Sequence, residues 1–274
     1  MDPMKSMEFV EKKRDLTILR SFPSNQRRFR MPLILLCAIL VLCSAPALAQ
    51  SAFPGDDAFA RMDYQGAIAT YDSLARVRPG DPQVQWRLAR ANVFVGDVSK
   101  GEEKKQAYLT AERYAREAMR IDSMLAESNT WLAAALGNTA MYEGSKKKIA
   151  LANDIKRLLL QSIKLNPRDD IAYSILGTFY LALGNVSWLE RTLANLLLGS
   201  LPEGGYEDAE AALLKALEIA PKVIRHRFEL GMVYTKMDRE ADARKEFEFC
   251  VSNPIQMASD RRRVEIARDW LEKH

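Results

Sequence analysis

The segment Leu230-Gly-Met-Val-Tyr234, followed by Ala243-Arg-Lys-Glu-Phe-Glu-Phe-Cys250 and then Pro254, decides the fold. In both pieces the apolar residues recur at helical spacing. The glycine of the first piece and the first alanine of the second are small, so the two helices approach closely there. The phenylalanine four residues after that alanine fills the remaining space, and the proline ends the second helix. The segment therefore predicts a hairpin of two packed helices.

The same pattern occurs elsewhere in the chain. Leu176-Gly-Thr-Phe-Tyr180 matches the first piece, and Tyr206-Glu-Asp-Ala209, which runs on to Pro221, matches the second. An earlier match to the second piece extends from Asp63 to Pro79. Small residues and large apolar residues at these positions of paired helices form the tetratricopeptide pattern, a helix–turn–helix unit of about 34 residues.

Proline spacing shows where the repeats are expanded. Pro167 and Pro221 are 54 residues apart, which is one repeat plus about 20 residues. Because 32 residues separate Gly177 from Ala209, against 12 at the matching place in the last repeat, the insertion lies across residues 183–205 of the fourth repeat. The second and third repeats are expected to carry extra residues around 95–106 and 138–150.

A last amphipathic helix, which begins after Ser259 and carries Trp270, is suited to cover the open end of the stack. The predicted fold class is therefore all-α. It is a right-handed tetratricopeptide-repeat αα-superhelix of about five repeats, with a long insert in the fourth repeat and a C-terminal capping helix.

The composition excludes several classes of protein. The chain has 274 residues, of which 48% are hydrophobic and 28% are charged, as in ordinary globular proteins. Residues 50–274 hold 32 basic and 32 acidic side chains, so this part has no net charge to attract nucleic acid. Its one cysteine, Cys250, leaves no disulfide and no cysteine metal cluster. No catalytic residue, metal site or cofactor is predicted, and we expect the protein not to be an enzyme.

The N-terminal residues have the pattern of an export signal. Arg27, Arg28 and Arg30 precede the apolar run 33–42, and small residues follow as far as Ala49. We therefore expect a leader over 1–49 with cleavage after Ala49, and a repeat domain over 50–274 in the periplasm or outside the cell. The alternative is an uncleaved N-terminal anchor, although the apolar run is shorter than the roughly 20 residues needed to span a bilayer.

Several motifs exceed what a generic repeat requires, and they occur in a fixed order. They are Trp86-Arg-Leu-Ala-Arg-Ala91, Tyr142-Glu-Gly-Ser-Lys-Lys-Lys-Ile-Ala150, Ile163-Lys-Leu-Asn-Pro-Arg-Asp169 and Ser187-Trp-Leu-Glu-Arg191. With these motifs the chain resembles the regulator of microtubule dynamics family over residues 81–271. The resemblance implies a non-enzymatic helical-repeat module. Members are associated with microtubules, with organelle membranes and, in one branch, with phospholipid binding. Microtubule binding is not expected here, because an exported protein does not meet microtubules.

In such a superhelix the first helix of each repeat lines the concave face. The repeat register predicts a mostly apolar groove with few cations, suited to an amphipathic protein helix or to the acyl chain of a phospholipid with an anionic head. The alternative is that its aromatic residues belong to the core between repeats. The predicted groove residues are Trp86, Arg90, Val93, Leu181, Phe228 and Met232.

The insert of the fourth repeat supplies the remaining predicted ligand residues, Trp188 and Arg191. Its leucines fall at helical spacing, which predicts either a lid over the groove, with Arg191 facing an anionic group, or an additional helix packed against its neighbours. The favoured function is a binding scaffold that holds a protein segment or a phospholipid in its groove. The alternative is an architectural subunit of a cell-envelope complex that binds through residues 187–191.

Three other features are predicted to be structural. Lys146, Lys147 and Lys148 follow no glycine-rich loop, so they form a solvated helix face in preference to a phosphate site. His226 has no carboxylate partner nearby in the sequence and is predicted to lie at the surface. Cys250 occupies a small-residue position of the repeat and is predicted to be a buried packing thiol.

Overall fold

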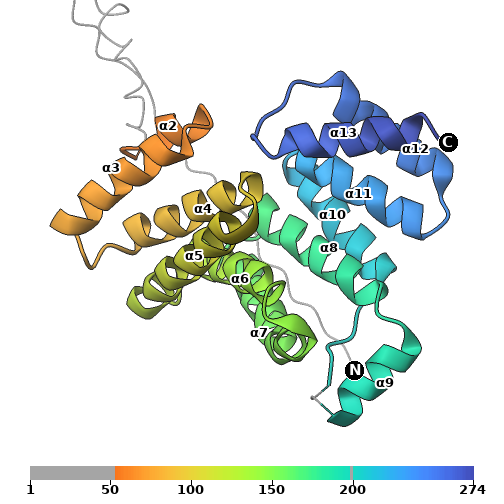
Figure 1. Cartoon of the computed structure of the whole chain (residues 1–274), viewed down its shortest axis with the longest axis horizontal. Helices are drawn as coiled ribbons and strands as arrows, with labels where there is room; N and C mark the ends of the chain where they lie inside the picture. Colours follow the sequence, from red (N-terminus) through yellow and green to blue (C-terminus); the bar gives the residue numbers. More distant parts are fainter. Residues whose placement is uncertain (1–52, 198–199) are drawn as a thin grey trace, which may run out of the picture. The chain divides into compact units, whose positions relative to one another are not determined.

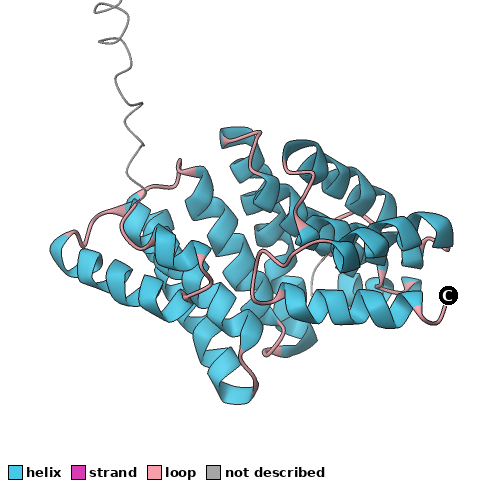
Figure 2. Ribbon diagram, turned by 90° about the horizontal axis from the view of Figure 1, so that it is seen from above, coloured by secondary structure: helices cyan, strands magenta, loops and turns pink. Residues whose placement is uncertain are grey.

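A computed structural model describes residues 53–197 and 200–274 of the protein. Figure 2 shows helices joined by loops, and no strand occurs within these ranges. By its contacts the chain divides into two units, Met1–Gln50 and Ser51–His274, and every described element belongs to the second. The predicted leader and its cleavage position lie outside the described residues. No helix in the described ranges has the length and apolar character needed to cross a membrane.

The helices form five antiparallel pairs that follow one another along the chain, and α13 packs on the last pair (Figure 1). In the sequence, the additional helix α9 comes between the two helices of the fourth pair. This arrangement confirms the predicted tetratricopeptide superhelix, its insert and its capping helix. The elements are α2 (Asp56–Ala60), α3 (Tyr64–Val77), α4 (Pro82–Val98), α5 (Gly101–Ile121), α6 (Ala126–Ala140), α7 (Gly144–Leu165), α8 (Asp170–Gly184), α9 (Trp188–Leu197), α10 (Tyr206–Ile219), α11 (Ile224–Lys236), α12 (Glu240–Ser252) and α13 (Asp260–Leu271).

Side-chain caps and prolines set the ends of these helices. The carboxylates of Asp63, Asp81 and Asp169 accept backbone N–H groups in the first turns of α3, α4 and α8. Four prolines each stand two residues beyond the end of a helix, where the preceding residue is driven out of the helical conformation. They are Pro79 after α3, Pro167 after α7, Pro221 after α10 and Pro254 after α12.

The expanded second and third repeats differ from the others in the length of their second helices. Helices α5 and α7 have 21 and 22 residues, whereas α3 and α10 have 14 each and α12 has 13. The extra residues therefore extend the helices and add no separate element. In the first repeat it is the first helix that differs in length, because α2 has 5 residues.

Glycines bring the two helices of a repeat together as the pattern predicts. A Cβ atom added to Gly177 would lie 2.5 Å from Cγ of Leu213, and one added to Gly231 would lie 2.6 Å from Cε1 of Phe247. In α4, Gly96 faces the ring of Tyr108 in the same way. A side chain at any of these positions would force the neighbouring ring or leucine to move, so the glycines let the paired helices pack at short distance.

The first and last parts of the repeat unit also meet. The hydroxyl of Tyr64 in α3 accepts the backbone N–H of Ala258, just before α13, at 3.1 Å. Tyr64 belongs to the main apolar core, together with Phe94 and Trp131. The core therefore connects helices of the first repeats with those of the last.

Candidate functional site

The predicted groove residues of α4 are engaged in packing. Trp86 and Val93 are buried in the main core, and the indole N–H of Trp86 donates to Oε1 of Gln83 at 3.0 Å. The guanidinium of Arg90 donates to Oδ1 of Asp56 at 2.7 Å and lies 3.8 Å from the ring centroid of Phe59. Arg90 therefore has an ion-pair partner within the protein, Asp56, which it shares with Arg87.

The predicted groove residues of α8 and α11 lie in similar surroundings. Phe228 is buried, with its ring centroid 5.9 Å from that of Phe247. Leu181 and Met232 are partly buried and pack against the same core. Contact of the six groove residues with a ligand stays a prediction, and in this structure the protein's own side chains cover most of their surface.

Helix α9 exposes a cluster of large apolar side chains. Trp188 is 79% exposed, Leu189 59%, Leu193 47% and Leu196 77%. Water next to so much apolar surface on one short helix is unfavourable, and such clusters are typical of binding surfaces. We call these four side chains the α9 apolar face.

Local sequence explains why α9 forms despite its exposure. The backbone N–H of Glu190 donates to Oγ of Ser187 at 3.3 Å, and the backbone N–H of Ser187 donates to Oε2 of Glu190 at 2.9 Å. This reciprocal capping box satisfies two backbone donors at the start of the helix. Hydrogen bonds from the hydroxyl and the backbone N–H of Ser187 also hold the pKa of Glu190 below its usual value.

Arg191 attaches α9 to the rest of the repeat. Its guanidinium donates to the backbone carbonyl of Pro202 at 3.2 Å and to that of Leu183 at 3.3 Å. On the same side of the helix Ala194 is buried. The side chain predicted to face an anionic group therefore positions α9, and its contact with a ligand stays a prediction.

The predicted lid does not match this placement. Figure 1 shows α9 beyond the end of α8, away from α4 and α11, which carry most of the predicted groove residues. The alternative of an additional helix packed against its neighbours fits the side of α9 that carries Arg191 and the buried Ala194, but the other side is exposed. The sequence indicated that burial of one face of this helix leaves apolar side chains on the other, and the exposed Trp188, Leu189, Leu193 and Leu196 agree with that expectation.

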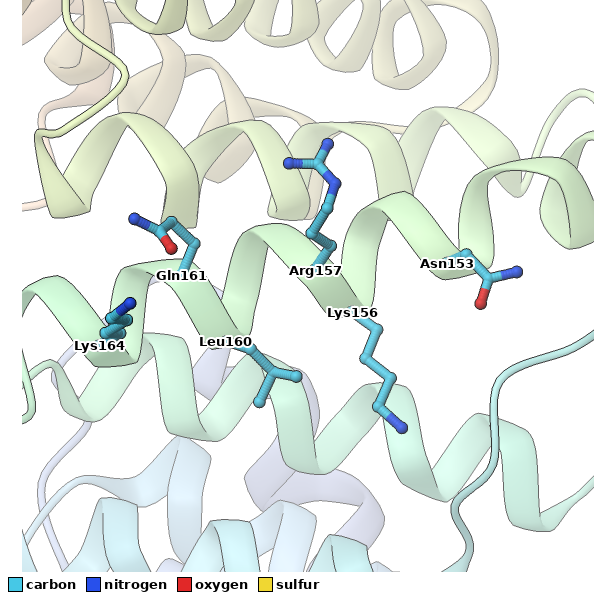
Figure 3. Close-up of a pocket in the computed structure, with 6 residues that line it drawn as sticks. All are labelled: Asn153, Lys156, Arg157, Leu160, Gln161 and Lys164. Carbon is cyan, nitrogen blue, oxygen red and sulfur yellow. The ribbon is translucent and has the colours of Figure 1, made fainter.

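A shallow hollow of about 410 Å³ lies along α7 (Figure 3). A smaller one, of about 170 Å³, is lined by residues of α5, of α6 and of the turn between α6 and α7. Neither includes a predicted groove or insert residue. The larger hollow is lined by Asn153, Lys156, Arg157, Leu160, Gln161 and Lys164.

His226 corrects one sequence prediction. It is fully buried, and its Nε2 lies 2.8 Å from Oδ2 of Asp170 at the start of α8. His226 stands four residues before Leu230 and therefore on the same, buried face of α11. The spacing from Leu230 could have predicted that His226 is buried. It could not have predicted the partner, Asp170, which is 56 residues away in the sequence.

Cys250 is buried as predicted, and it packs in the main core. Burial raises the pKa of its thiol to about 12, so at neutral pH it is a protonated packing group and not a nucleophile. Within the described ranges, no group of three His, Cys, Asp or Glu side chains is placed to hold a metal ion.

Comparison with known proteins identifies the family of this chain. The family model described as regulator of microtubule dynamics protein 1-3 matches residues 55–274. The chain belongs to this family. It is 31% identical over 163 residues to regulator of microtubule dynamics protein 1 of Mus musculus, covering 58% of this chain and 53% of that one. It is 30% identical over 162 residues to regulator of microtubule dynamics protein 3 of Rattus norvegicus, covering 58% and 34%.

The chain spans about half the length of the curated protein 1 relatives that it matches. Among solved structures, it is similar to a thermophilic tetratricopeptide-repeat protein of Thermus thermophilus. The TM-score is 0.59 at 18% identity, covering 80% of this chain and 95% of that one. This likeness, like the family match, agrees with the helical-repeat fold.

Proposed function

We propose that this family member is a non-enzymatic binding scaffold that holds an amphipathic protein segment on the α9 apolar face. One observation carries the proposal: α9 is an insertion in a regular repeat, and it presents four large apolar side chains to solvent. A partner that covers them removes apolar surface from water, which contributes about 25 cal/mol per Å². The sequence offered binding through the insert as the alternative to the groove. We prefer the insert because most of the surface of the predicted groove residues is covered by packing within the protein.

The nature of the partner follows from the shape of the surface. A single amphipathic helix exposing a Trp among leucines suits helix-on-helix contact, in which a large aromatic side chain anchors the interface. The curated relatives are named for microtubule dynamics. We propose that the present chain does not share a microtubule partner, because the leader expected over residues 1–49 would direct it out of the cytoplasm.

The double substitution Trp188→Ser and Leu196→Ser is expected to weaken partner binding at least tenfold, because it removes the two most exposed anchors of the face. Stability should change by no more than about 0.5 kcal/mol, since both side chains lie in solvent. Pull-down from cells that produce the chain, followed by titration of the recovered partner, measures the loss.

The matched control is Val77→Ser with Met124→Ser, which removes exposed apolar side chains from other repeats. It should leave binding unchanged. Equal binding by the α9 variant and the parent protein would contradict the proposal.

Native mass spectrometry of the purified protein tests lipid binding in the groove. A phospholipid that co-purifies with the parent and is lost when Trp86 and Phe228 are replaced would support the groove as a lipid site instead.

Export is tested separately by sequencing the N-terminus of the mature protein. Cleavage by signal peptidase after Ala49 predicts a first residue of Gln50. A mature chain that starts at Met1 or Met31 would contradict cleavage, and recovery of that chain in the membrane fraction would support the uncleaved anchor.

A further inference from the structure

Helix α7 carries a strong excess of positive charge. Between Gly144 and Leu165 it holds six basic side chains and one acidic side chain, Asp154. The hollow along this helix is lined by three cations and by no carboxylate (Figure 3). We call its lining the α7 basic stripe, which consists of Asn153, Lys156, Arg157, Leu160, Gln161 and Lys164.

The stripe begins where the chain returns from α9. The side-chain amide of Asn153 donates to the backbone carbonyl of Ser200 at 2.9 Å, and Nζ of Lys156 donates to that of Glu203 at 2.8 Å. These bonds fix the segment after α9 against α7. Ser200 stands three residues after the end of α9 in the sequence, a span of at most about 11 Å, so the C-terminal end of α9 is near the start of the basic stripe.

Two cations of the stripe remain available to a partner. Lys164 has no ion pair within 4.0 Å among the described residues, and Arg157 has one, with Asp154 at 3.2 Å, in which both side chains are more than half exposed. Such an exposed pair is worth about 0–1 kcal/mol and is readily exchanged for another carboxylate. Leu160 lies between these two cations and is 46% exposed, so the stripe offers an apolar contact at its centre.

We propose that the α7 basic stripe is the second half of the docking surface, and that the partner is an acidic amphipathic protein helix. This inference rests on the proposed function of α9. The apolar side chains of the partner cover the α9 apolar face, and its Asp and Glu side chains lie along the stripe. Charge complementarity identifies this occupant, because the lining supplies cations and amide groups without a carboxylate.

The dimensions of the stripe suit a linear segment. From Asn153 to Lys164 the helix rises about 17 Å, the length of roughly three helical turns. Arg157 and Lys164 are seven residues apart, which is about two helical turns, so carboxylates two turns apart on a partner helix match these two cations. A hollow bordered by side chains accepts the side chains of such a helix, whereas a bilayer surface contacts protruding groups and leaves a hollow unfilled.

The test uses two labelled peptides of about 18 residues, long enough for about 27 Å of helix. Both carry the same apolar face of Leu and Phe, and their polar faces carry Glu in one and Lys in the other. Fluorescence anisotropy with the full chain should show binding of the Glu peptide, at least tenfold weaker binding of the Lys peptide, and weakening of the Glu complex by added salt.

The variant Arg157→Gln with Lys164→Gln should bind the Glu peptide roughly tenfold more weakly than the parent, and its binding should depend less on salt. Lys156 is kept because it holds the segment after α9. The matched control, Lys222→Gln with Lys245→Gln, removes two exposed cations from other parts of the chain and should bind as the parent does.

The outcomes separate the two proposals. If the Trp188→Ser and Leu196→Ser variant loses the Glu peptide while the Arg157→Gln and Lys164→Gln variant keeps it, the stripe is not part of the surface and the present inference fails alone. If both variants bind as the parent does, the proposed function fails as well. Failure of the parent to bind the Glu peptide would overturn the inference. So would binding to vesicles of phosphatidylcholine and phosphatidylglycerol that requires Arg157 and Lys164 without any peptide binding.

Discussion

Replacing Asp56 by Asn is expected to lower the free energy of unfolding by about 2–3 kcal/mol, less than the 3–5 kcal/mol of a fully buried pair. The Asp56 carboxylate accepts the hydroxyl of Tyr71 at 2.6 Å, Nε of Arg87 at 3.1 Å and Nη2 of Arg90 at 2.7 Å. The two arginine side chains are only 12% and 17% exposed, whereas Asp56 is 26% exposed. The substitution therefore leaves two largely buried cations without a counter-charge.

The pH dependence of this effect follows from the pKa of Asp56. Burial raises this pKa, but the hydrogen bond from Tyr71 and the charges of Arg90 and Arg87 outweigh burial and hold it below 3.8. A carboxyl group that is more acidic in the folded state stabilises the fold above its unfolded pKa, and the stabilisation is lost as the pH falls through the folded value.

Urea unfolding of the parent and of the Asp56→Asn variant should therefore differ most near neutral pH, begin to converge at about pH 4 and converge fully only below the folded pKa of Asp56. A matched control is Tyr71→Phe, which removes the hydrogen bond that the hydroxyl donates to Asp56 and the one that it accepts from Arg90 but keeps the charges, and which should cost about 1–2 kcal/mol. A difference between parent and Asp56→Asn that is the same at all pH values would show that the carboxylate charge does not stabilise the first repeat.

Replacing Gly231 by Ala is expected to lower the free energy of unfolding by about 2 kcal/mol, since the added methyl group overpacks the core. Its Cβ would lie 2.6 Å from Cε1 and 2.9 Å from Cδ1 of Phe247. That ring is fully buried, and its centroid is 5.9 Å from that of Phe228 and 5.0 Å from that of Trp270. The ring therefore has little room to move aside.

The chain contains a close control for this substitution. Leu136-Gly137 in α6 repeats the dipeptide Leu230-Gly231, but a Cβ on Gly137 would meet no atom within 4 Å. Gly137→Ala should therefore stabilise the protein by about 0.5–1 kcal/mol, because alanine loses less backbone entropy in a helix. Thermal unfolding followed by circular dichroism compares the two variants. The same sign of change in both would contradict the close approach of α11 and α12.

Much of the fold could be predicted because the repeat pattern is local. Gly177 and Gly231 sit beneath the large residues that the spacing assigned to them, and each proline that was expected to end a helix stands two residues past one. The insert of the fourth repeat and the capping helix followed from arithmetic on the same landmarks. These features depend on residues within one hairpin, which a single sequence displays.

The candidate site depended on contacts between distant repeats, which the pattern does not display. Trp86 and Phe228 stand at helical spacing that fits either a groove or a core. Their burial depends on a core that joins distant repeats, in which Tyr64, for example, bonds to Ala258, 194 residues away. His226 and Asp170 illustrate the same point. For α9 the sequence indicated both the apolar spacing and an exposed apolar side, but not the place of the helix beyond the end of α8.

Hydrogen–deuterium exchange of the protein with and without its recovered partner tests the central claim most directly. The account predicts slower exchange on binding at residues 187–197 of α9 and along α7, with no change in α4 and α11. Slower exchange confined to α4 and α11, with α9 unaffected, would contradict it and would place the ligand in the groove.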